Sequence, residues 1–211
     1  MKKVLIFLIA ALFCFSGYAQ RRESPDSKFI YMTSVGYATG LGEISLPNDQ
    51  GEELKTVQNR TFDISVNQLL GYQFNPYFQM GLGAGFDFWR YTAFIPIYLN
   101  FTVNFTDTQF EPVFYLNAGY SFKWYVSSVP EKADRVVHGT KTGPMGESGI
   151  GLRININDKM SLLLAACYKV QYSDVRYTIL RPGEQDFSAY STNARKDALY
   201  HFAGIRLGFQ Y

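Results

Sequence analysis

The sequence predicts an all-β fold, an eight-stranded antiparallel up-and-down transmembrane β-barrel. Apolar residues recur at every second position in eight segments, which is the period of a β-strand with two unlike faces. Connections on one side of the predicted sheet are all short, while most of those on the other side are long. Aromatic residues make up 17% of the 211 residues and charged residues only 18%, whereas a typical soluble domain contains roughly 25% charged residues.

The first 19 residues have the features of a cleavable secretory signal peptide. Lys2 and Lys3 precede an almost wholly apolar run, and Gly17 and Ala19 place small residues at the two recognition positions of a cleavage site. We therefore expect a signal peptide over residues 1–19 and a single barrel domain over residues 20–211.

The charge and cysteine content of the mature chain limit which functions are expected of it. Loss of Lys2 and Lys3 takes the formal charge from +2 to zero, so no general electrostatic attraction to nucleic acid is expected. Only Cys167 remains after cleavage at Ala19, and one thiol cannot form an internal disulfide. We expect no metal and no cofactor.

The eight predicted strands share the alternation of apolar residues with polar residues or glycine. In chain order they are residues 29–41, 62–74, 78–88, 93–105, 110–124, 145–156, 160–172 and 199–211. The first is the weakest. The pattern is clearest from Phe62 to Phe74, where Asp63 and Asn67 belong to the polar face. Turn-forming residues follow at 75–77 and 157–159.

The connections indicate a membrane barrel with both ends of the chain on one side. Short turns are predicted near residues 75, 107 and 158, and long loops at 42–60, 127–143 and 173–197; the outer connection at 90–92 is short. This asymmetry is typical of bacterial outer-membrane barrels. In hydrocarbon a sheet must close, because every backbone polar group needs an internal partner. A soluble lipocalin-like barrel or sandwich is the alternative, but it would turn the charged, glycine-rich face into water.

Two stretches carry a resemblance to a known family. Gly81–Phe86 followed by Phe94–Ile97, and the terminal strand Gly204–Tyr211, resemble the small outer-membrane β-barrel-domain proteins related in fold to OmpA and OmpX. The resemblance covers nearly the whole mature chain and implies a Gram-negative outer-membrane location. It also implies recognition by the barrel-assembly machinery through the C-terminal residues Leu207, Phe209 and Tyr211.

Charged residues on the polar face form the first candidate site. An eight-stranded barrel is just wide enough to be filled by its own side chains. We therefore expect a buried network of ion pairs and hydrogen bonds in the lumen, with a conducting pore as the alternative. The predicted members are Asp63, Asp87, Glu111, Lys123, Glu147, Arg153, Lys169 and Arg206.

Basic residues in the long loops form the second candidate site. Guanidinium groups bind phosphate in a bidentate way, so lipopolysaccharide phosphates or another surface ligand are candidate partners. Interleaved acidic residues favour ordinary solvated loop charge instead. The predicted contacts are Lys132, Arg135, Lys141, Arg176, Arg181, Arg195 and Lys196.

The functional expectation is a structural or surface-interaction role rather than an enzymatic one. Hydrolysis or acyl transfer needs a base beside a nucleophile, and the histidines available are His138 in a loop and His201 near the outer end of the last strand. A lipid A-modifying enzyme and an accessory barrel of a secretion or translocation assembly are the alternatives. The expected partners are outer-membrane lipid, lipopolysaccharide, the assembly machinery and an envelope protein.

Overall fold

The structure, a computed structural model, describes residues 29–47, 53–89, 92–126, 136–157, 160–179 and 192–211. The predicted signal peptide and its cleavage site lie outside these residues and stay a prediction. Nearly all the described residues belong to β-strands. No helix in the described part is both long and apolar enough to cross a membrane.

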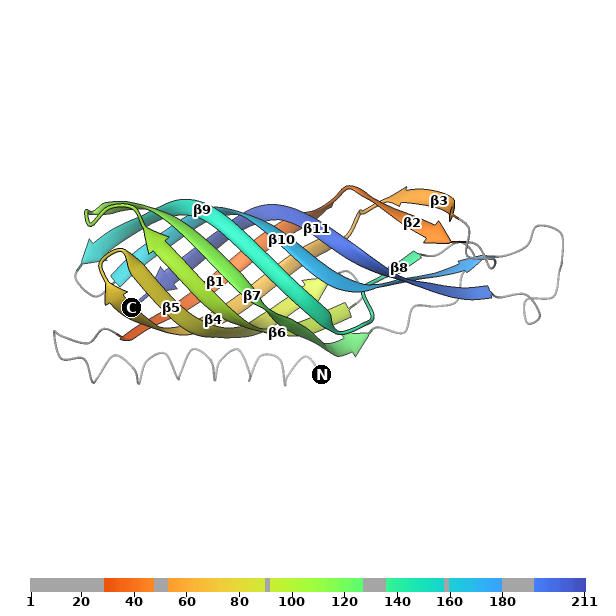
Figure 1. Cartoon of the computed structure of the whole chain (residues 1–211), viewed down its shortest axis with the longest axis horizontal. Coiled ribbons are helices and arrows are strands. Elements are labelled where there is room, and N and C mark those ends of the chain that lie inside the picture. The colour runs from red at the N-terminus through yellow and green to blue at the C-terminus, as the bar shows by residue number, and fades with distance from the viewer. Residues whose placement is uncertain (1–28, 48–52, 90–91, 127–135, 158–159, 180–191) are drawn as a thin grey trace.

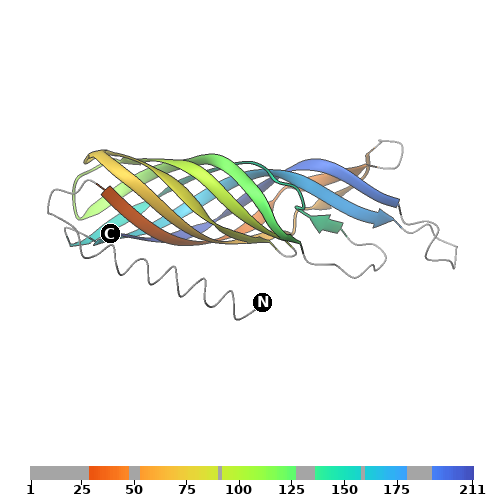
Figure 2. The same cartoon turned by 90° about the horizontal axis from the view of Figure 1, so that it is seen from below.

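Eight strands close into one antiparallel barrel (Figures 1 and 2). Each strand pairs with the next, and β11 pairs with both β10 and β1, so the sheet closes on itself. The prediction of an eight-stranded antiparallel barrel is confirmed. The barrel strands are β1 (Phe29–Leu41), β4 (Phe62–Asn75), β5 (Phe78–Trp89), β6 (Thr92–Asn104), β7 (Phe110–Val126), β9 (Gly143–Asn157), β10 (Met160–Ile179) and β11 (Thr192–Gln210).

We call the end of the barrel with the short connections the turn end. The beginning of β1 and the C-terminal residue lie together there, since the backbones of Tyr31 and Tyr211 exchange two hydrogen bonds of 2.8 Å. Between β4 and β5, the Asn75 side-chain Oδ1 accepts a hydrogen bond of 2.9 Å from the backbone N–H of Tyr77. Such a local side-chain acceptor is why asparagine favours turns.

We call the opposite end the loop end, and it contains more strand than the alternation predicts. The first long connection forms a hairpin of β2 (Glu43–Pro47) and β3 (Glu53–Gln58). The second contains β8 (Val136–His138), which pairs with β10. The third is shorter than predicted, because β10 and β11 stay paired out to Ile179 and Thr192. Strands outside a membrane need no apolar face. Their sequences therefore lack the alternation of apolar and polar residues from which the barrel strands are predicted.

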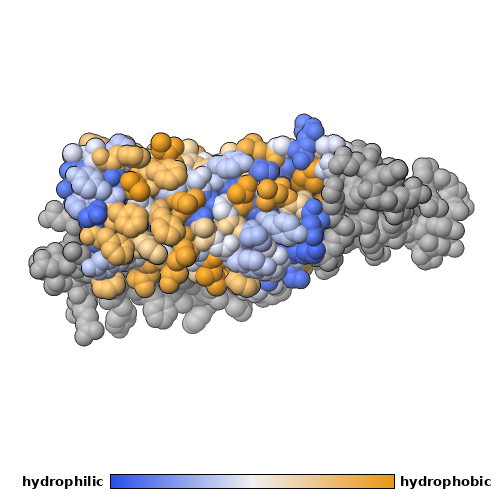
Figure 3. Space-filling model, viewed as in Figure 1, coloured by the Kyte–Doolittle hydropathy of each residue, from blue (hydrophilic) through white to orange (hydrophobic). Residues whose placement is uncertain are grey.

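The outer wall of the barrel is apolar (Figure 3). Leucine and isoleucine side chains such as Leu82 and Ile150 are more than 60% exposed, which is costly in water but suits contact with acyl chains. Aromatic rings pack in pairs toward both ends of the wall, for example Phe29 with Tyr72 at 5.3 Å and Phe86 with Trp124 at 4.9 Å between ring centroids. Two such girdles are typical of outer-membrane barrels.

Candidate functional site

The polar face of the strands lines the inside of the barrel. Alternate residues of each strand point inward, and in β4 these are Asp63, Ser65, Asn67 and Leu69, all of which are buried. The interior of an eight-stranded barrel is just wide enough to be filled by side chains. The candidate site is the lumen, and its charged residues form three groups that follow one another from the turn end to the loop end.

The group nearest the turn end is built around Arg153 of β9. Its Nη1 donates to Asn104 Oδ1 at 2.9 Å and its Nη2 donates to Gln79 Oε1 at 3.1 Å. The same guanidinium lies 3.6 Å from Glu111 Oε2, and the other carboxylate oxygen of Glu111 accepts a hydrogen bond of 2.7 Å from Asn155 Nδ2. Four strands thus meet at one buried charge.

The middle group pairs Arg206 of β11 with Glu147 of β9. Arg206 Nη2 donates to Glu147 Oε2 at 2.6 Å, and its Nη1 donates to Ser34 Oγ at 3.2 Å. The second carboxylate oxygen of Glu147 accepts a hydrogen bond of 2.8 Å from the Tyr115 hydroxyl. The Arg206 guanidinium also lies 6.0 Å from the centre of the Tyr115 ring, a favourable arrangement of a cation and an aromatic face.

The group nearest the loop end places one ammonium between two carboxylates. Lys169 Nζ of β10 donates to Asp63 Oδ2 of β4 at 2.7 Å and to Asp87 Oδ2 of β5. All three side chains are almost completely buried. We call these three residues the Lys169 cluster.

Lys123 is not part of the network, although its position in the alternation predicted a place there. Its side chain is exposed. The last backbone pair between β7 and β9 is Ser121 with Gly143, so Lys123 lies beyond the point where β9 still forms the wall. Its backbone N–H instead donates to Thr142 Oγ1 at 3.0 Å. The pairing of β6 with β7 also shifts register next to it, between Ala93 and Phe94.

An aromatic lid closes the lumen on the loop-end side of the Lys169 cluster. It consists of Trp89, Phe94, Tyr200 and Phe202. The Trp89 ring lies at its centre, with centroid distances of 4.9 Å to Phe94, 5.1 Å to Tyr200 and 5.0 Å to Phe202. The other three rings are fully buried. The lid was not predicted, but Phe94, Tyr200 and Phe202 do share the alternation of inward residues, and this signal was available.

The loops hold the lid in place. Ile44 of β2 packs into the same apolar cluster. Gly139 adopts a positive φ of 69°, and a Cβ atom there would lie 2.4 Å from the Trp89 ring, so only glycine permits this approach. The backbone N–H of Gly139 and the hydroxyl of Tyr200 both donate to the carbonyl of Asp174. The carboxylate of Asp174 accepts hydrogen bonds from the backbone N–H and the hydroxyl of Thr140.

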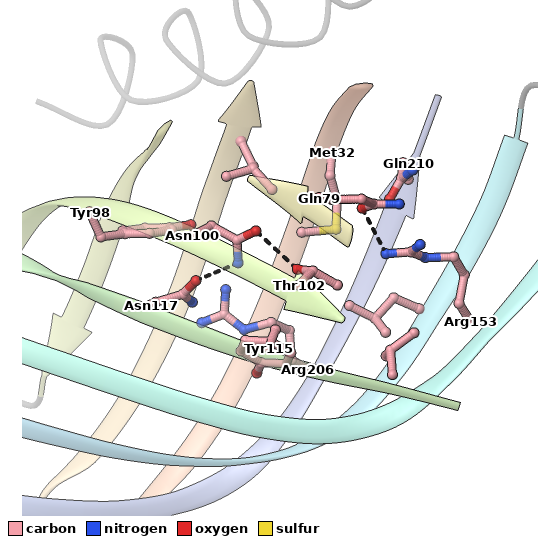
Figure 4. A pocket seen from close by; sticks show the side chains of 13 residues that line it. Met32, Gln79, Tyr98, Asn100, Thr102, Tyr115, Asn117, Arg153, Arg206 and Gln210 are labelled. Atoms are coloured by element: carbon pink, nitrogen blue, oxygen red, sulfur yellow. Dashed lines mark hydrogen bonds between the residues drawn. The ribbon is translucent and has the colours of Figure 1, made fainter. Parts of the chain in front are cut away.

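The lumen contains a small cavity. Between the Arg153 and Arg206 groups lies a cavity of about 10 Å³, which is room for on the order of one water molecule. Figure 4 shows the polar side chains around it, with Thr102 donating to Asn100 at 3.0 Å and Asn100 donating to Asn117 at 2.7 Å. These side chains line the cavity.

A groove lies at the loop end, where the β2–β3 hairpin leaves the barrel. Gly42, with a φ of 74°, turns the chain out of β1. Asn59 anchors the returning chain, because its Nδ2 donates to the carbonyl of His201 at 3.3 Å and its Oδ1 accepts from the backbone N–H of Thr61. The resulting groove has a volume of about 570 Å³. We call it the hairpin groove, and it is lined by Thr39, Gly40, Leu41, Gly42, Glu43, Gln58, Asn59 and Arg60.

Of the seven predicted loop cations, Lys141 is the one whose side chain lies within the described part of the structure. Lys141 forms an ion pair with Asp197 on the surface. Arg176 and Arg195 are opposite each other in the pairing of β10 with β11, and Lys196 is opposite Val175; the side chains of these three cations lie outside the described part. Lys132, Arg135 and Arg181 lie outside it altogether.

His201 and the C-terminal residues Leu207 and Phe209 lie on the outer wall. His201 Nδ1 is 2.6 Å from the Tyr168 hydroxyl, while the side chain of His138 is not described. Leu207 is exposed on β11, and Phe209 stacks toward Tyr211 at 5.6 Å between centroids. These positions suit contact with lipid, and recognition by the assembly machinery stays a prediction.

No protein-family model and no curated protein sequence matches the chain. Solved structures do match it. Neisserial surface protein A is 12% identical with a TM-score of 0.50, and the match covers 87% of this chain and 96% of that one. OprG from Pseudomonas aeruginosa is 16% identical with a TM-score of 0.48, covering 90% and 99%. The outer membrane protein AlkL, solved in lipid bilayers, is 12% identical with a TM-score of 0.46, covering 90% and 93%.

At such low identities the likeness concerns the fold alone. It agrees with the closed sheet, the apolar wall and the two aromatic girdles, all of which this chain possesses. The chain has the fold of a small eight-stranded outer-membrane β-barrel.

Proposed function

We propose that this barrel has a sealed lumen and acts at the cell surface through its loop end, in a structural or surface-interaction role. The observation that carries the proposal is the filling of the lumen. Three charged groups and the aromatic lid occupy its length, and the cavity between two of the groups has room for about one water molecule. Steady ion conduction needs a continuous file of water, which this packing leaves no space for.

The second support is the amount of ordered structure outside the membrane. β10 has 20 residues, which at a rise of roughly 3.3 Å per residue and a tilt of about 45° extend about 45 Å along the barrel axis. The apolar band of such barrels is about 25 Å tall. About 20 Å of sheet therefore projects beyond it, and Figure 1 shows β10 and β11 continuing past the other barrel strands.

The hairpin groove is the surface that we assign to recognition. Its volume lies in the range of about 300–1,000 Å³ that ligand sites occupy. Glu43, Gln58 and Arg60 in its lining offer positive and negative charge and both donors and acceptors of hydrogen bonds. The proposed partner is a component of the envelope surface, either a protein or the polar part of lipopolysaccharide. The loop cations stay candidates for phosphate contacts.

Site-specific photo-crosslinking in intact cells tests this role. A crosslinker at exposed Glu43 or Gln58 is expected to form an adduct with an envelope component. The matched control positions are Asp107 and Gln109, which are exposed at the turn end. Identical adduct patterns from both ends, or no adduct from the loop end, would contradict the proposal.

The proposal includes no catalytic step. On the outer wall His201 contacts the hydroxyl of Tyr168, which is not the serine or thiol nucleophile of common hydrolases. We expect the lipid A profile of cells to be the same with and without the protein. A missing or added acyl chain in the deletion strain would favour the enzyme alternative instead.

A further inference from the structure

The Lys169 cluster differs from the other two charged groups of the lumen in its charge balance. Arg153 faces one carboxylate, Glu111, and Arg206 faces one carboxylate, Glu147. Lys169 alone faces two, from Asp63 and Asp87. If all three members of this cluster were ionised, the cluster would carry one net negative charge.

No other cation in the described lumen is available to cancel that charge. The other charged group that acts on Asp63 is Glu147 of β9, a third carboxylate, which is already bound to Arg206 of β11 at 2.6 Å. Lys123, which the sequence placed in the network, is exposed at the rim. The remaining inward neighbours on β10 and β11 are Gln171 and Phe202, and both are uncharged.

Burial makes the imbalance costly. The three side chains are only 2–3% exposed. The lid covers them on the loop side, since Trp89 is the backbone partner of Asp63 and Phe202 is the partner of Lys169. A buried charge without a partner is strongly unfavourable, so such a group tends to bind a proton and become neutral.

Hydrogen bonding points to the same conclusion. Asp63 Oδ1 is fully buried and has no hydrogen-bond partner among the described residues. Asp63 pairs with Trp89, and Ser65 pairs with Asp87, so the two aspartates are diagonal neighbours on adjacent strands, whose side chains are within reach of each other. Two carboxylates that converge on one ammonium repel each other, and one added proton removes the repulsion.

We propose that the folded barrel binds one proton at the Asp63–Asp87 pair at neutral pH. The cluster then consists of one ammonium, one carboxylate and one carboxylic acid, and it is neutral overall. The proton belongs to the pair rather than to either aspartate, because both carboxyl groups contact the same Lys169 Nζ. This inference goes beyond the surface role and holds whether or not the loop end has a partner.

Binding of this proton links folding to pH. In the unfolded chain both aspartates release their protons near pH 4, so above that pH the folded barrel holds one proton more than the unfolded chain. Stability therefore falls as pH rises, and the equilibrium constant for unfolding increases about tenfold per pH unit until the folded pair also releases its proton.

Infrared spectroscopy of the purified barrel in detergent tests the proposal. The wild type at pH 7 is expected to show the carbonyl stretch of a protonated carboxyl group. Asp63→Asn and Asp87→Asn are each expected to remove that band, because either variant leaves Lys169 with a single carboxylate. Asp107→Asn, at an exposed turn-end position, is the control that keeps it.

A second measurement uses the pH dependence of unfolding in urea. The tenfold change per pH unit is expected for the wild type and should be lost in Asp63→Asn. Absence of the carbonyl band at pH 7, or a band that persists in both aspartate variants, would overturn the proposal. So would stability that depends on sodium or potassium concentration but not on pH, because a bound metal cation would then balance the charge.

Discussion

The two halves of the lumen are filled by side chains of opposite character. Toward the turn end, Arg153 and Arg206 each bind a carboxylate contributed by another strand. Toward the loop end, beyond the Lys169 cluster, three rings from two strands pack on Trp89. The first half depends on matched partners, because removing one leaves a buried charge. The second depends on shape. Mutations in the charged groups and mutations in the aromatic lid should therefore change stability for different reasons.

The largest effect is expected in the charged half. Arg206→Met leaves Glu147 buried without a cation and should lower the free energy of unfolding by about 3–5 kcal/mol. Urea titration of the barrel in detergent measures this. The double variant Arg206→Met with Glu147→Met removes both charges and should cost less than the single variant. A double variant whose cost equals the sum of the two single ones would show that the groups do not act as a pair.

A smaller effect is expected where the loop meets the lid. Gly139→Ala adds a Cβ that would lie 2.4 Å from the Trp89 ring at a residue with a φ of 69°. The backbone strain and the displaced ring together should cost on the order of 1–3 kcal/mol. Tryptophan fluorescence should change as well, since the ring has to move. Gly42 has a similar φ but open space around it. Gly42→Ala is therefore the control that separates the cost of backbone strain from the cost of displacing the Trp89 ring.

The smallest effect is expected at the surface. Lys141 and Asp197 form an ion pair, but their side chains are 36% and 44% exposed. Water and salt screen such pairs, so Lys141→Ala should change the free energy of unfolding by less than about 1 kcal/mol. A loss as large as that of Arg206→Met would mean that the loop end is more dehydrated than its exposure indicates.

The sequence predicts the wall of the barrel better than its ends. Within the membrane, lipid on one side and packed side chains on the other impose a strict alternation, and this is why the ranges of β4 and β5 and the inward position of Asp63 were predictable. Beyond the membrane that constraint disappears. The β2–β3 hairpin and the exposed position of Lys123 depend on where neighbouring strands stop pairing, which the period of one strand does not reveal.

The filling of the lumen was predictable only in part. Charged residues at inward positions are unusual enough to identify a buried network from sequence. The alternation of β11 places Tyr200 and Phe202 on the inward face, but their packing on Trp89 depends on the spatial arrangement of β5, β6 and β11, which the period of one strand does not reveal. The charge imbalance of the Lys169 cluster likewise needs three strands, β4, β5 and β10, to be placed together.

Conductance across a planar bilayer tests most directly whether the lumen is sealed. The processed protein, refolded and inserted, is expected to give no steps above the baseline, because the lid and the three charged groups occupy the lumen and the cavity between the Arg153 and Arg206 groups has room for about one water molecule. Steady, uniform conductance steps from the wild-type barrel would contradict the account.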